Sequence, residues 1–431
     1  VKCMNTADVI AAVNFARTHQ LVVAVRGQGH SVAGHGTCDD GLVIDLSGMR
    51  GTRVDPHRQT IRVEGGCNLG DLDHATHAFG LATSSGIASV TGLSGLTLGG
   101  GFGHLNRKCG LACDNLISAD VVTADGQFLV ASADNEHADL FWALRGGGGN
   151  FGVVTSFEFK LYPINTVYGG PMFWPIEMAE EGLCFFRDLM AQAPTDLNVI
   201  FGFITLQPEP VLPPELHYKK VFAAALCYAG PLDEAEEVFA PIRQFGPPMI
   251  DQAGPMPYPA LQSMFDELFP DNLFHYWKSD FIADLPDEAI KLHVAHGTQL
   301  PSPLAAVHFY SMGGAIQNLQ DDETPFSHRS AKFMHAIVGT TDNLDDIKAQ
   351  KTWARNYWSA ARPYAMGGAY INIAMEDTED PVEPVYNKNY QRLVEVKSLA
   401  CCWQTGDCGF LRHLPLRTAQ LRPAKPRLGD L

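Results

Sequence analysis

Three glycine-rich segments constrain this chain more than any other feature of its sequence. The first is Arg-Gly-Gln-Gly-His-Ser at residues 26–31, directly after the apolar run at residues 22–25. The second, residues 86–103, has seven glycines in eighteen residues, and the third is Gly-Gly-Gly-Gly-Asn-Phe-Gly at residues 146–152. Glycine allows positive φ and lets backbone amides point toward an anion. Three such segments, each beside a β-type run, predict a domain that holds one extended ligand.

Each glycine-rich segment alone has a simpler interpretation. A strand followed by Gly-X-Gly is often an ordinary turn, and His30 is then a surface or hydrogen-bonded residue. The second segment has too many glycines for a helix, and the Ile, Val and Leu residues between them favour a buried segment over a flexible loop. A Rossmann dinucleotide loop is a third alternative, but no clean strand precedes these glycines and no acidic residue follows on a second strand about 20 residues later.

Composition and charge exclude several classes of partner. The chain has 431 residues, of which 46% are hydrophobic and 18% charged, and it is long enough for two globular domains. Its formal net charge of -17 disfavours nucleic acid and anionic membranes, which need clusters of Lys and Arg. No apolar run reaches about 18 residues, and the first residues have no signal-peptide pattern. We therefore expect a small-molecule partner, neutral or cationic, with no nucleic acid and no membrane.

The ten cysteines are too few and too scattered for a disulfide framework in a chain of this size. Reduced thiols are expected, which slightly favours a cytoplasmic setting. Cys109 and Cys113 lie four residues apart, but no second Cys or His pair at metal spacing accompanies them. The sequence therefore predicts no metal site.

Periodicity and turn signals divide the chain into two parts. In the first, helices and strands alternate with short connections, and a hairpin is expected through Asp125-Gly126. Helices are predicted there at residues 6–17, 69–79 and 139–145, and the first of them begins at a cap-like Thr6. Strands are predicted at 22–25, 42–46, 60–66, 118–124, 128–131 and 153–154. From residue 161 onward the expected helices are 185–193, 234–243 and 259–268, and the expected strands are 199–206, 221–228 and 305–311. The fold class is therefore α+β, with an antiparallel sheet backed by helices in the second part.

The glycine-rich segments, together with residues 108–116 and 139–145, resemble the berberine-bridge-enzyme-like FAD-linked oxidases of the vanillyl-alcohol oxidase superfamily. The similarity is closest to the bacterial branch that includes 6-hydroxy-D-nicotine oxidase, and it covers residues 2–397. It implies a two-part PCMH-type FAD-binding domain at residues 1–163 and a substrate domain at residues 164–372. Residues 373–431 would return to the FAD-binding domain.

The same resemblance implies which residues hold the cofactor. The histidine of the family's first loop bonds to the flavin 8α-methyl group, and this role falls on His30. Many members bond a cysteine to flavin C6 as well, but Ala88 stands at that place, so we expect no cysteinyl link. The predicted FAD-binding residues are Arg26, Gly27, Gln28, Gly29, His30, Ser31, Thr91, Gly92, Gly95, Gly99, Gly100, Gly101, Gly103, Asn115, Asn150, Gly152 and Val154.

Three residues of the second part are the catalytic candidates. His335 aligns with a base of some plant members, although an imidazole on an apolar strand is more often a hydrogen-bonded core residue. Tyr370 and Asn372 alternate with apolar neighbours at a place where relatives build the substrate pocket. Ile373 matches a catalytic tyrosine of some relatives, so that role is not carried over.

The resemblance implies an FAD-dependent oxidase. A C–H bond beside an OH or NH group of a small substrate would deliver hydride to flavin N5, and O2 would be reduced to H2O2. After Lys397 the chain departs from the family, which continues with an Asp-Pro turn and an Asn-rich tail, and this departure indicates a shifted reading frame or a divergent terminus. A catalytically impaired flavin-binding relic is therefore an alternative, and a nicotinamide dehydrogenase is the alternative that glycine loops alone suggest.

Overall fold

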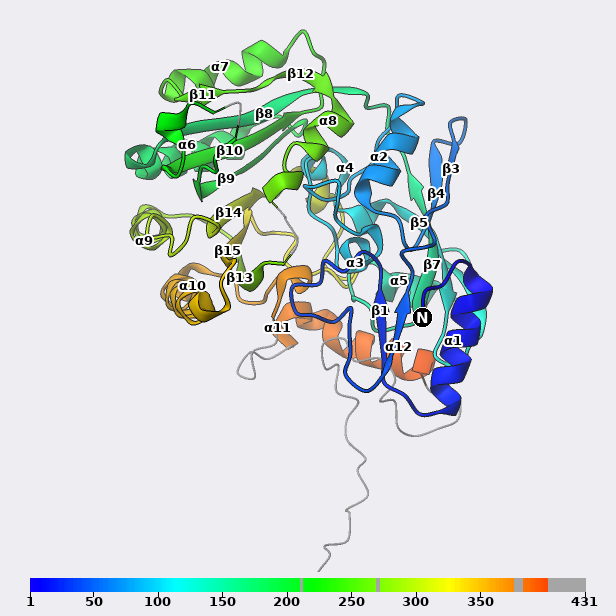
Figure 1. Ribbon diagram of the computed structural model, residues 1–431. Helices are drawn as coiled ribbons and strands as arrows, with labels where there is room; N and C mark the ends of the chain where they lie inside the picture. Colours follow the sequence, from blue (N-terminus) through cyan, green and yellow to red (C-terminus); the bar gives the residue numbers. More distant parts are fainter. Residues whose placement is uncertain (210–211, 269–271, 376–382, 402–431) are drawn as a thin grey trace, which may run out of the picture.

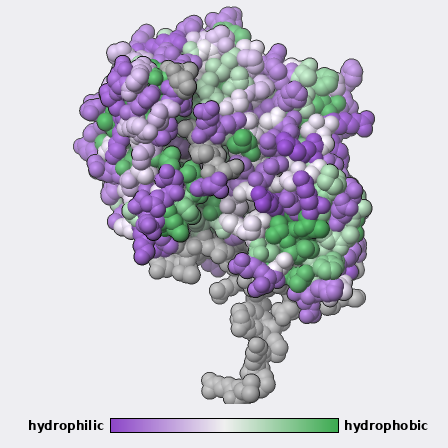
Figure 2. Space-filling view, in the orientation of Figure 1, coloured by the Kyte–Doolittle hydropathy of each residue, from purple (hydrophilic) through white to green (hydrophobic). Residues whose placement is uncertain are grey.

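The computed structural model describes residues 1–209, 212–268, 272–375 and 383–401, and most of the divergent tail after Lys397 lies outside these ranges. The described chain forms two units that lie side by side (Figure 1). None of the helices in these ranges has the length and apolar character needed to cross a bilayer. Hydrophilic residues cover most of the face shown in Figure 2, and hydrophobic residues gather in smaller areas between them.

The first unit contains a parallel pair, β1 with β2, and a five-stranded antiparallel sheet in the order β3-β4-β7-β5-β6. Its strands are β1 Val23–Arg26, β2 Leu42–Asp45, β3 Thr52–Asp55, β4 Thr60–Glu64, β5 Leu116–Val122, β6 Phe128–Ser132 and β7 Val153–Lys160. Its helices are α1 Thr6–Thr18, α2 Leu69–His77, α3 Leu93–Leu98, α4 Asn106–Cys109 and α5 Ala138–Leu144, with the 3-10 helix η1 Ala112–Asn115.

Local sequence signals predicted most of this unit, with two corrections. The hairpin turn forms as expected, since Gly126 has φ 81° and its N–H donates to the Thr123 carbonyl. The cap of α1 is Asn5, whose side chain accepts from the Asp8 N–H, and not Thr6. The expectation that residues 86–103 contain no helix was wrong, because α3 forms between Gly92 and Gly99 with Leu93 and Leu98 buried. Burial of the leucines outweighs the low helix propensity of glycine.

The second unit is built on an eight-stranded antiparallel sheet in the order β11-β8-β10-β9-β14-β15-β13, with β12 also paired to β8. Its strands are β8 Thr166–Pro175, β9 Leu197–Thr205, β10 Lys220–Tyr228, β11 Ile250–Asp251, β12 Gly254–Pro257, β13 Phe274–Ile282, β14 Ala306–Ser311 and β15 Phe333–Thr341. Its helices are α6 Ala179–Gln192, α7 Ala235–Phe245, α8 Tyr258–Ser263, α9 Asp287–Gly297 and α10 Ile347–Ala361, and its 3-10 helices are η2 Ile176–Met178, η3 Pro214–Leu216, η4 Asp266–Leu268, η5 Gly314–Asn318 and η6 Leu344–Asp346. The predicted α+β class, with an antiparallel sheet backed by helices, is confirmed.

The two faces of the large sheet pack against different partners. On β15, Phe333 and Ile337 belong to a core shared with α6, α9 and α10, which lie on the side away from the first unit (Figure 1). Met334 and Ala336 alternate with them and belong to a core shared with Phe102 of the first unit. Because side chains alternate along a strand, one face of this sheet is covered by its own helices and the other faces the glycine-rich unit.

The end of the described chain returns to the first unit. It contains η7 Arg362–Tyr364, η8 Ile371–Ile373, α11 Glu383–Tyr386, η9 Asn387–Asn389 and α12 Tyr390–Cys401. Tyr386 and Leu393 are buried in the core of the first unit. The Arg392 guanidinium lies 4.0 Å from the ring centroid of Trp142 on α5. The first unit therefore takes part of its core from the far end of the sequence.

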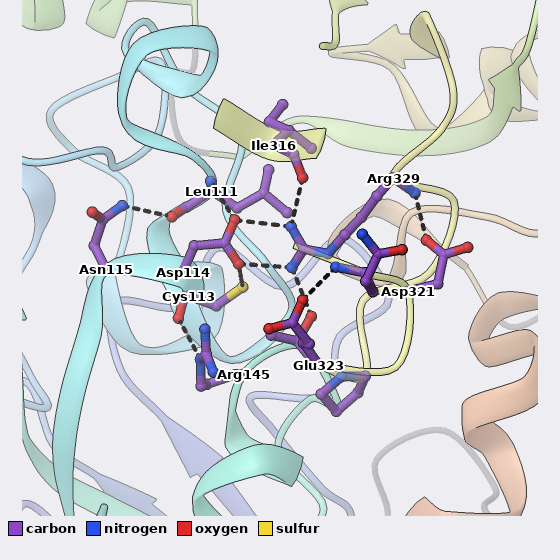
Figure 3. Close-up of polar contacts among 12 residues, drawn as sticks. Leu111, Cys113, Asp114, Asn115, Arg145, Ile316, Asp321, Glu323 and Arg329 are labelled. Carbon is purple, nitrogen blue, oxygen red and sulfur yellow. Dashed lines mark hydrogen bonds and ion pairs between the residues drawn. The ribbon is translucent and has the colours of Figure 1, made fainter. Parts of the chain in front are cut away.

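A buried ion pair joins the two units (Figure 3). Arg329 of the second unit donates to both carboxylate oxygens of Asp114, at 2.7 and 3.0 Å, and its side chain is only 2% exposed. The same guanidinium donates to the carbonyl of Ile316 and to the Thr324 hydroxyl, and the Leu111 N–H donates to Asp114. Bidentate geometry and additional hydrogen bonds compensate both charges for the loss of water.

We predict that Arg329→Met lowers the free energy of unfolding by about 3–5 kcal/mol, because Asp114 would remain buried without its cation. Denaturant unfolding followed by tryptophan fluorescence measures this change. Arg50→Met is the matched control, since the Arg50–Asp71 pair has the same 2.7 Å contact but a half-exposed arginine. The control should change the free energy by less than about 1 kcal/mol, and equal losses in both variants would contradict the prediction.

Candidate functional site

The loop after β1 lies against the second glycine-rich segment. Gly29 has φ 83°, a conformation that side chains rarely adopt. A Cβ on Gly92 would stand 3.0 Å from the Gln28 Cβ, and the Gln28 amide nitrogen donates to the carbonyl of Gly66. The loop is thus anchored at Gln28, while His30 on the same loop is exposed.

Backbone donors are available on this loop. Within the described ranges, the N–H groups of Gly27, Gln28 and Gly29 donate no hydrogen bond. The Ser31 hydroxyl accepts from the His35 N–H at 3.1 Å and so supports the turn itself. The Arg26 side chain is exposed and folds across Gly29, where a Cβ would stand 3.2 Å from its Nε. The loop therefore presents several main-chain donors beside a cation, which suits an anionic group.

Main chain packs on main chain beneath the loop. A Cβ on Gly66 would stand 1.7 Å from the Leu46 carbonyl oxygen, and one on Gly65 would stand 2.5 Å from that of Val154. Gly95 is different, because apart from the backbone of its own helix and its chain neighbours no described atom lies within 4 Å of the place of its Cβ. Gly65, Gly66 and Gly95 thus form a surface without side chains, which we call the glycine floor. It is closely packed at Gly65 and Gly66 and has open space at Gly95.

Two of the predicted catalytic residues lie at the end of this floor. The Tyr370 hydroxyl accepts from the Gly101 N–H at 3.1 Å and from the Asn372 side-chain amide at 2.7 Å. The same amide donates to the Leu96 carbonyl at 2.9 Å, and the Asn372 oxygen fills the place of a Cβ on Gly99. Tyr370 and Asn372 therefore contact the second glycine-rich segment, and their catalytic role stays a prediction.

The Tyr370 hydroxyl is protonated and has a hydrogen available for a hydrogen bond. Burial raises the pKa of its phenol to about 12, so the hydroxyl is protonated at neutral pH. Its hydrogen has no acceptor among the described residues, because the oxygen is the acceptor in both of its hydrogen bonds. Tyr370 belongs to an aromatic wall, which we define as Phe102, Tyr310, Phe326 and Tyr370, with the Phe102 ring centroid 4.9 to 6.1 Å from those of the other three.

The third glycine-rich segment converges on the second. The Gly148 N–H donates to the Leu98 carbonyl at 2.9 Å. The Asn150 amide donates to the Gly147 carbonyl at 3.0 Å, and its oxygen accepts from Lys397 Nζ at 3.4 Å. Gly152 serves packing, since its φ is 139° and a Cβ would collide with β5.

Some predicted cofactor residues make internal contacts instead. The Asn115 amide donates to the carbonyls of Cys109 and Leu111, and its oxygen accepts from the Tyr162 hydroxyl. The Thr91 carbonyl accepts from the Leu69 N–H, and the Gly103 carbonyl accepts from the Asn198 side chain of β9. Asn115 therefore holds the loop that carries Asp114, and its predicted contact with a cofactor stays a prediction.

The structure separates His335 from Tyr370 and Asn372. Its ring lies on the helix-covered face of β15, stacked on Phe309 at 4.6 Å and 4.7 Å from the His293 ring of α9. Burial, reinforced by the neighbouring His293, lowers its pKa well below the ordinary value. The alternative interpretation of His335 as a core histidine fits this environment, and a direct role beside the glycine-rich segments does not.

A histidine that the sequence did not single out lies on the other face. His308 of β14 pairs with Ala336, and its ring is 6.0 Å from that of Tyr310 in the aromatic wall. Its buried Nδ1 has no hydrogen-bond partner in the part of the chain that the structure describes. Burial lowers the pKa of this imidazole to about 4, so it is neutral at physiological pH. Alternation along the predicted strand places His308 on the opposite face from Val307 and Phe309, and this was the sequence signal that could have singled it out.

Within the described ranges, no three His, Cys, Asp or Glu residues are grouped so that they could hold a metal ion. Cys109 and Cys113, the pair with four-residue spacing, are buried in different hydrophobic clusters. The groups that the described residues bring to the site are backbone amides, aromatic rings, neutral polar side chains and the Arg26 cation.

Known proteins match this chain over most of its length. The FAD binding domain family matches residues 1–132. An FAD-linked oxidoreductase of Dictyostelium discoideum is 33% identical over 398 residues, which cover 91% of this chain and 84% of that protein. The (R)-6-hydroxynicotine oxidase of Paenarthrobacter nicotinovorans is 30% identical over 407 residues, which cover 92% of this chain and 86% of that protein.

A solved structure has the same arrangement of elements. The crystal structure of 6-hydroxy-D-nicotine oxidase from Arthrobacter nicotinovorans matches with a TM-score of 0.81 at 27% sequence identity. The match covers 93% of this chain and 88% of that one, so it includes both units.

The buried imidazole of His335 should make the protein acid-sensitive. Its pKa is lowered in the folded state, so the unfolded chain binds the proton and stability is lost as pH falls below the ordinary value of about 6.5. His335→Phe should reduce the loss of unfolding free energy between pH 7.5 and pH 5 by up to about 2 kcal/mol. Denaturant unfolding at both pH values measures it. His74→Phe, which removes an exposed imidazole, should keep the wild-type loss, and an unchanged loss in His335→Phe would contradict the prediction.

Proposed function

Because this chain belongs to the berberine-bridge-enzyme-like FAD-linked oxidoreductases, we propose that it is an oxidase of a small apolar molecule. Bound FAD would supply the acceptor of a hydride from a C–H bond beside an OH or NH group, with O2 reduced to H2O2. The observation that carries this proposal is the contact of the first and third glycine-rich segments with the second, which also binds the Tyr370 hydroxyl. The name of the 30% identical relative, a hydroxynicotine oxidase, supports oxidation with O2.

The residues present fit FAD. The unpaired N–H groups of residues 27–29 suit the diphosphate, and the floor without side chains between Gly65 and Gly95 suits close approach of an extended cofactor. Asn150 holds the third segment through its hydrogen bond to the Gly147 carbonyl, and we propose that it lies at the far end of the cofactor site. We propose that these segments, with Arg26 beside them, hold the cofactor.

We propose that His30 attaches the flavin covalently through its 8α-methyl group. Its exposed imidazole stands on a loop that Gln28 anchors to the glycine floor. Ala88 carries no nucleophile at the position where many relatives have a second link, so one bond is expected.

If His30 is bonded to the flavin, we expect the flavin to stay with the polypeptide after acid precipitation. His30→Ala should release all of it to the supernatant, because no other nucleophile replaces the imidazole. Intact mass and visible absorbance of pellet and supernatant measure the distribution. Ser31→Ala, the neighbouring control, should keep the mass of one FAD. Flavin retained by His30→Ala would contradict the attachment, and protein that is colourless at every stage would contradict FAD itself.

We propose that Tyr370 and His308 orient and deprotonate the substrate. The Tyr370 hydroxyl has a hydrogen to donate, and the neutral His308 Nδ1 or Nε2 can accept the proton of a substrate OH or NH. The aromatic wall between them excludes water and gives apolar surface to the substrate. An aromatic or otherwise apolar alcohol or amine without net negative charge fits these groups.

His308 and His335 form a matched pair for testing this proposal, since both are buried imidazoles on adjacent strands but on opposite faces. His308→Phe should lower kcat/KM by about 100-fold or more, the usual contribution of acid–base catalysis. It should also abolish an acidic limb of the pH profile near pH 4. Peroxide release on a panel of aromatic alcohols and cyclic amines measures both. His335→Phe should stay within about twofold of wild type, and equal losses in both variants would contradict the assignment.

A further inference from the structure

The loop that leads into the second glycine-rich segment, residues 85–91, is held from both sides. On one side the backbone of α2 donates to it, with Gly70 N–H to the Ser89 carbonyl at 2.8 Å and Leu69 N–H to that of Thr91 at 2.9 Å. On the other side, residues 258–268 of the second unit contact the loop, and we call them the α8–η4 segment. This loop continues directly into Gly92, which contacts Gln28, so its path fixes where the glycine floor begins.

Gln262 of the α8–η4 segment holds the start of the loop. Its side-chain amide donates to the Gly86 carbonyl at 2.8 Å and to the Ser85 hydroxyl at 3.4 Å. The Tyr258 hydroxyl donates to the Gln262 oxygen at 3.1 Å and so orients the amide. Gln262 and Tyr258 are fully buried, so these hydrogen bonds have no competition from water.

A ring pair holds the middle of the loop. Phe265 stacks on His104 with the centroids 5.5 Å apart and the planes 26° apart. His104 Nε2 lies 3.3 Å from the Ile87 carbonyl, and because a carbonyl only accepts, this nitrogen carries the hydrogen. Burial lowers the pKa of His104 to about 4, so a neutral imidazole makes the contact.

Asp266 holds the end of the loop. Its carboxylate accepts from the Ser89 N–H at 2.7 Å and from the Ser89 hydroxyl at 2.5 Å. No other acceptor serves this N–H in the described ranges. Two donors to one ionised carboxylate form the strongest kind of hydrogen-bonded contact in this loop. It is also the one contact of the loop in which a charged residue of the second unit binds the backbone of the first.

We propose that Asp266 is a positioning residue for the cofactor, which acts through Ser89 to set the path of residues 85–91. Through this contact, the position of the second unit influences the geometry of the glycine floor. The inference rests on the proposed FAD site, but the contact itself can be measured without reference to turnover. Asp266 touches no predicted cofactor residue, and its effect passes through the backbone of the loop.

Hydrogen exchange and flavin spectroscopy on the purified holoprotein test this inference. Asp266→Ala should raise the exchange rate of the Ser89 amide by about tenfold or more, since it loses a charge-assisted acceptor. It should also shift the visible flavin spectrum and the midpoint potential, and raise KM or lower kcat without loss of bound flavin. Asp266→Asn keeps one oxygen for the Ser89 N–H and should restore part of each property. Asp284→Ala removes an exposed carboxylate that pairs with Lys332 in the same unit, and it should change none of them.

Several outcomes would overturn the inference. Wild-type exchange of the Ser89 amide in Asp266→Ala would show that the carboxylate does not hold the loop. Faster exchange with an unchanged flavin spectrum, potential and KM would show that the loop does not position the cofactor. Protein without flavin would instead contradict the proposed function, and in that case Ser89 exchange still reports on the contact. Should Asp266→Ala fail to fold, Ser89→Ala, which removes only the hydroxyl donor, should show a smaller change in the same direction.

Discussion

Contact of main chain with main chain at glycine positions is the constraint on which this structure depends. Gly66 packs against the Leu46 carbonyl and Gly65 against the Val154 carbonyl at distances where a Cβ would collide. These two contacts bring the turn after β4 against the end of β2 and the start of β7. Any side chain there would separate the layers by several ångströms, and the loop that presents His30 would lose the surface on which Gln28 anchors it. Sequence freedom is therefore lowest where the site has no side chains at all.

The second unit completes this floor, and buried charges fix its place. Arg329 and Asp114 meet across the boundary with little exposure to water. Arg107 of the first unit crosses it in the opposite direction, with its guanidinium on the carbonyls of Met190 and Ala193 at the C-terminal end of α6, where the helix dipole favours a cation. A desolvated ion tolerates few alternative positions, because each displacement leaves it without partners. The relative placement of Tyr370 and the glycine segments follows from these contacts.

The sequence predicted the elements whose signals are local, and missed those that depend on partners. The helix at Thr6–Thr18, the Asp-Gly hairpin and the convergence of the glycine segments follow from periodicity and from the properties of glycine. Strands β13 and β15 are buried on both faces, so their apolar runs lack the alternation that marks a half-exposed strand. The sequence selected His335 through its alignment with a base of some plant members, whereas the strand pairing shows that His308 lies on the face toward the first unit. The contact between Asp266 and Ser89 joins residues 177 positions apart, a separation at which no local pattern operates.

The return of the chain to the first unit affects the order in which the protein folds. Tyr386 and Leu393 complete a core whose other members, such as Trp142 and Phe157, precede them by more than two hundred positions. During synthesis the second unit has all its strands available while the first still lacks α12. The later half of the chain can thus mature before the earlier half, and the nascent first unit keeps an exposed apolar surface until α12 has been synthesised.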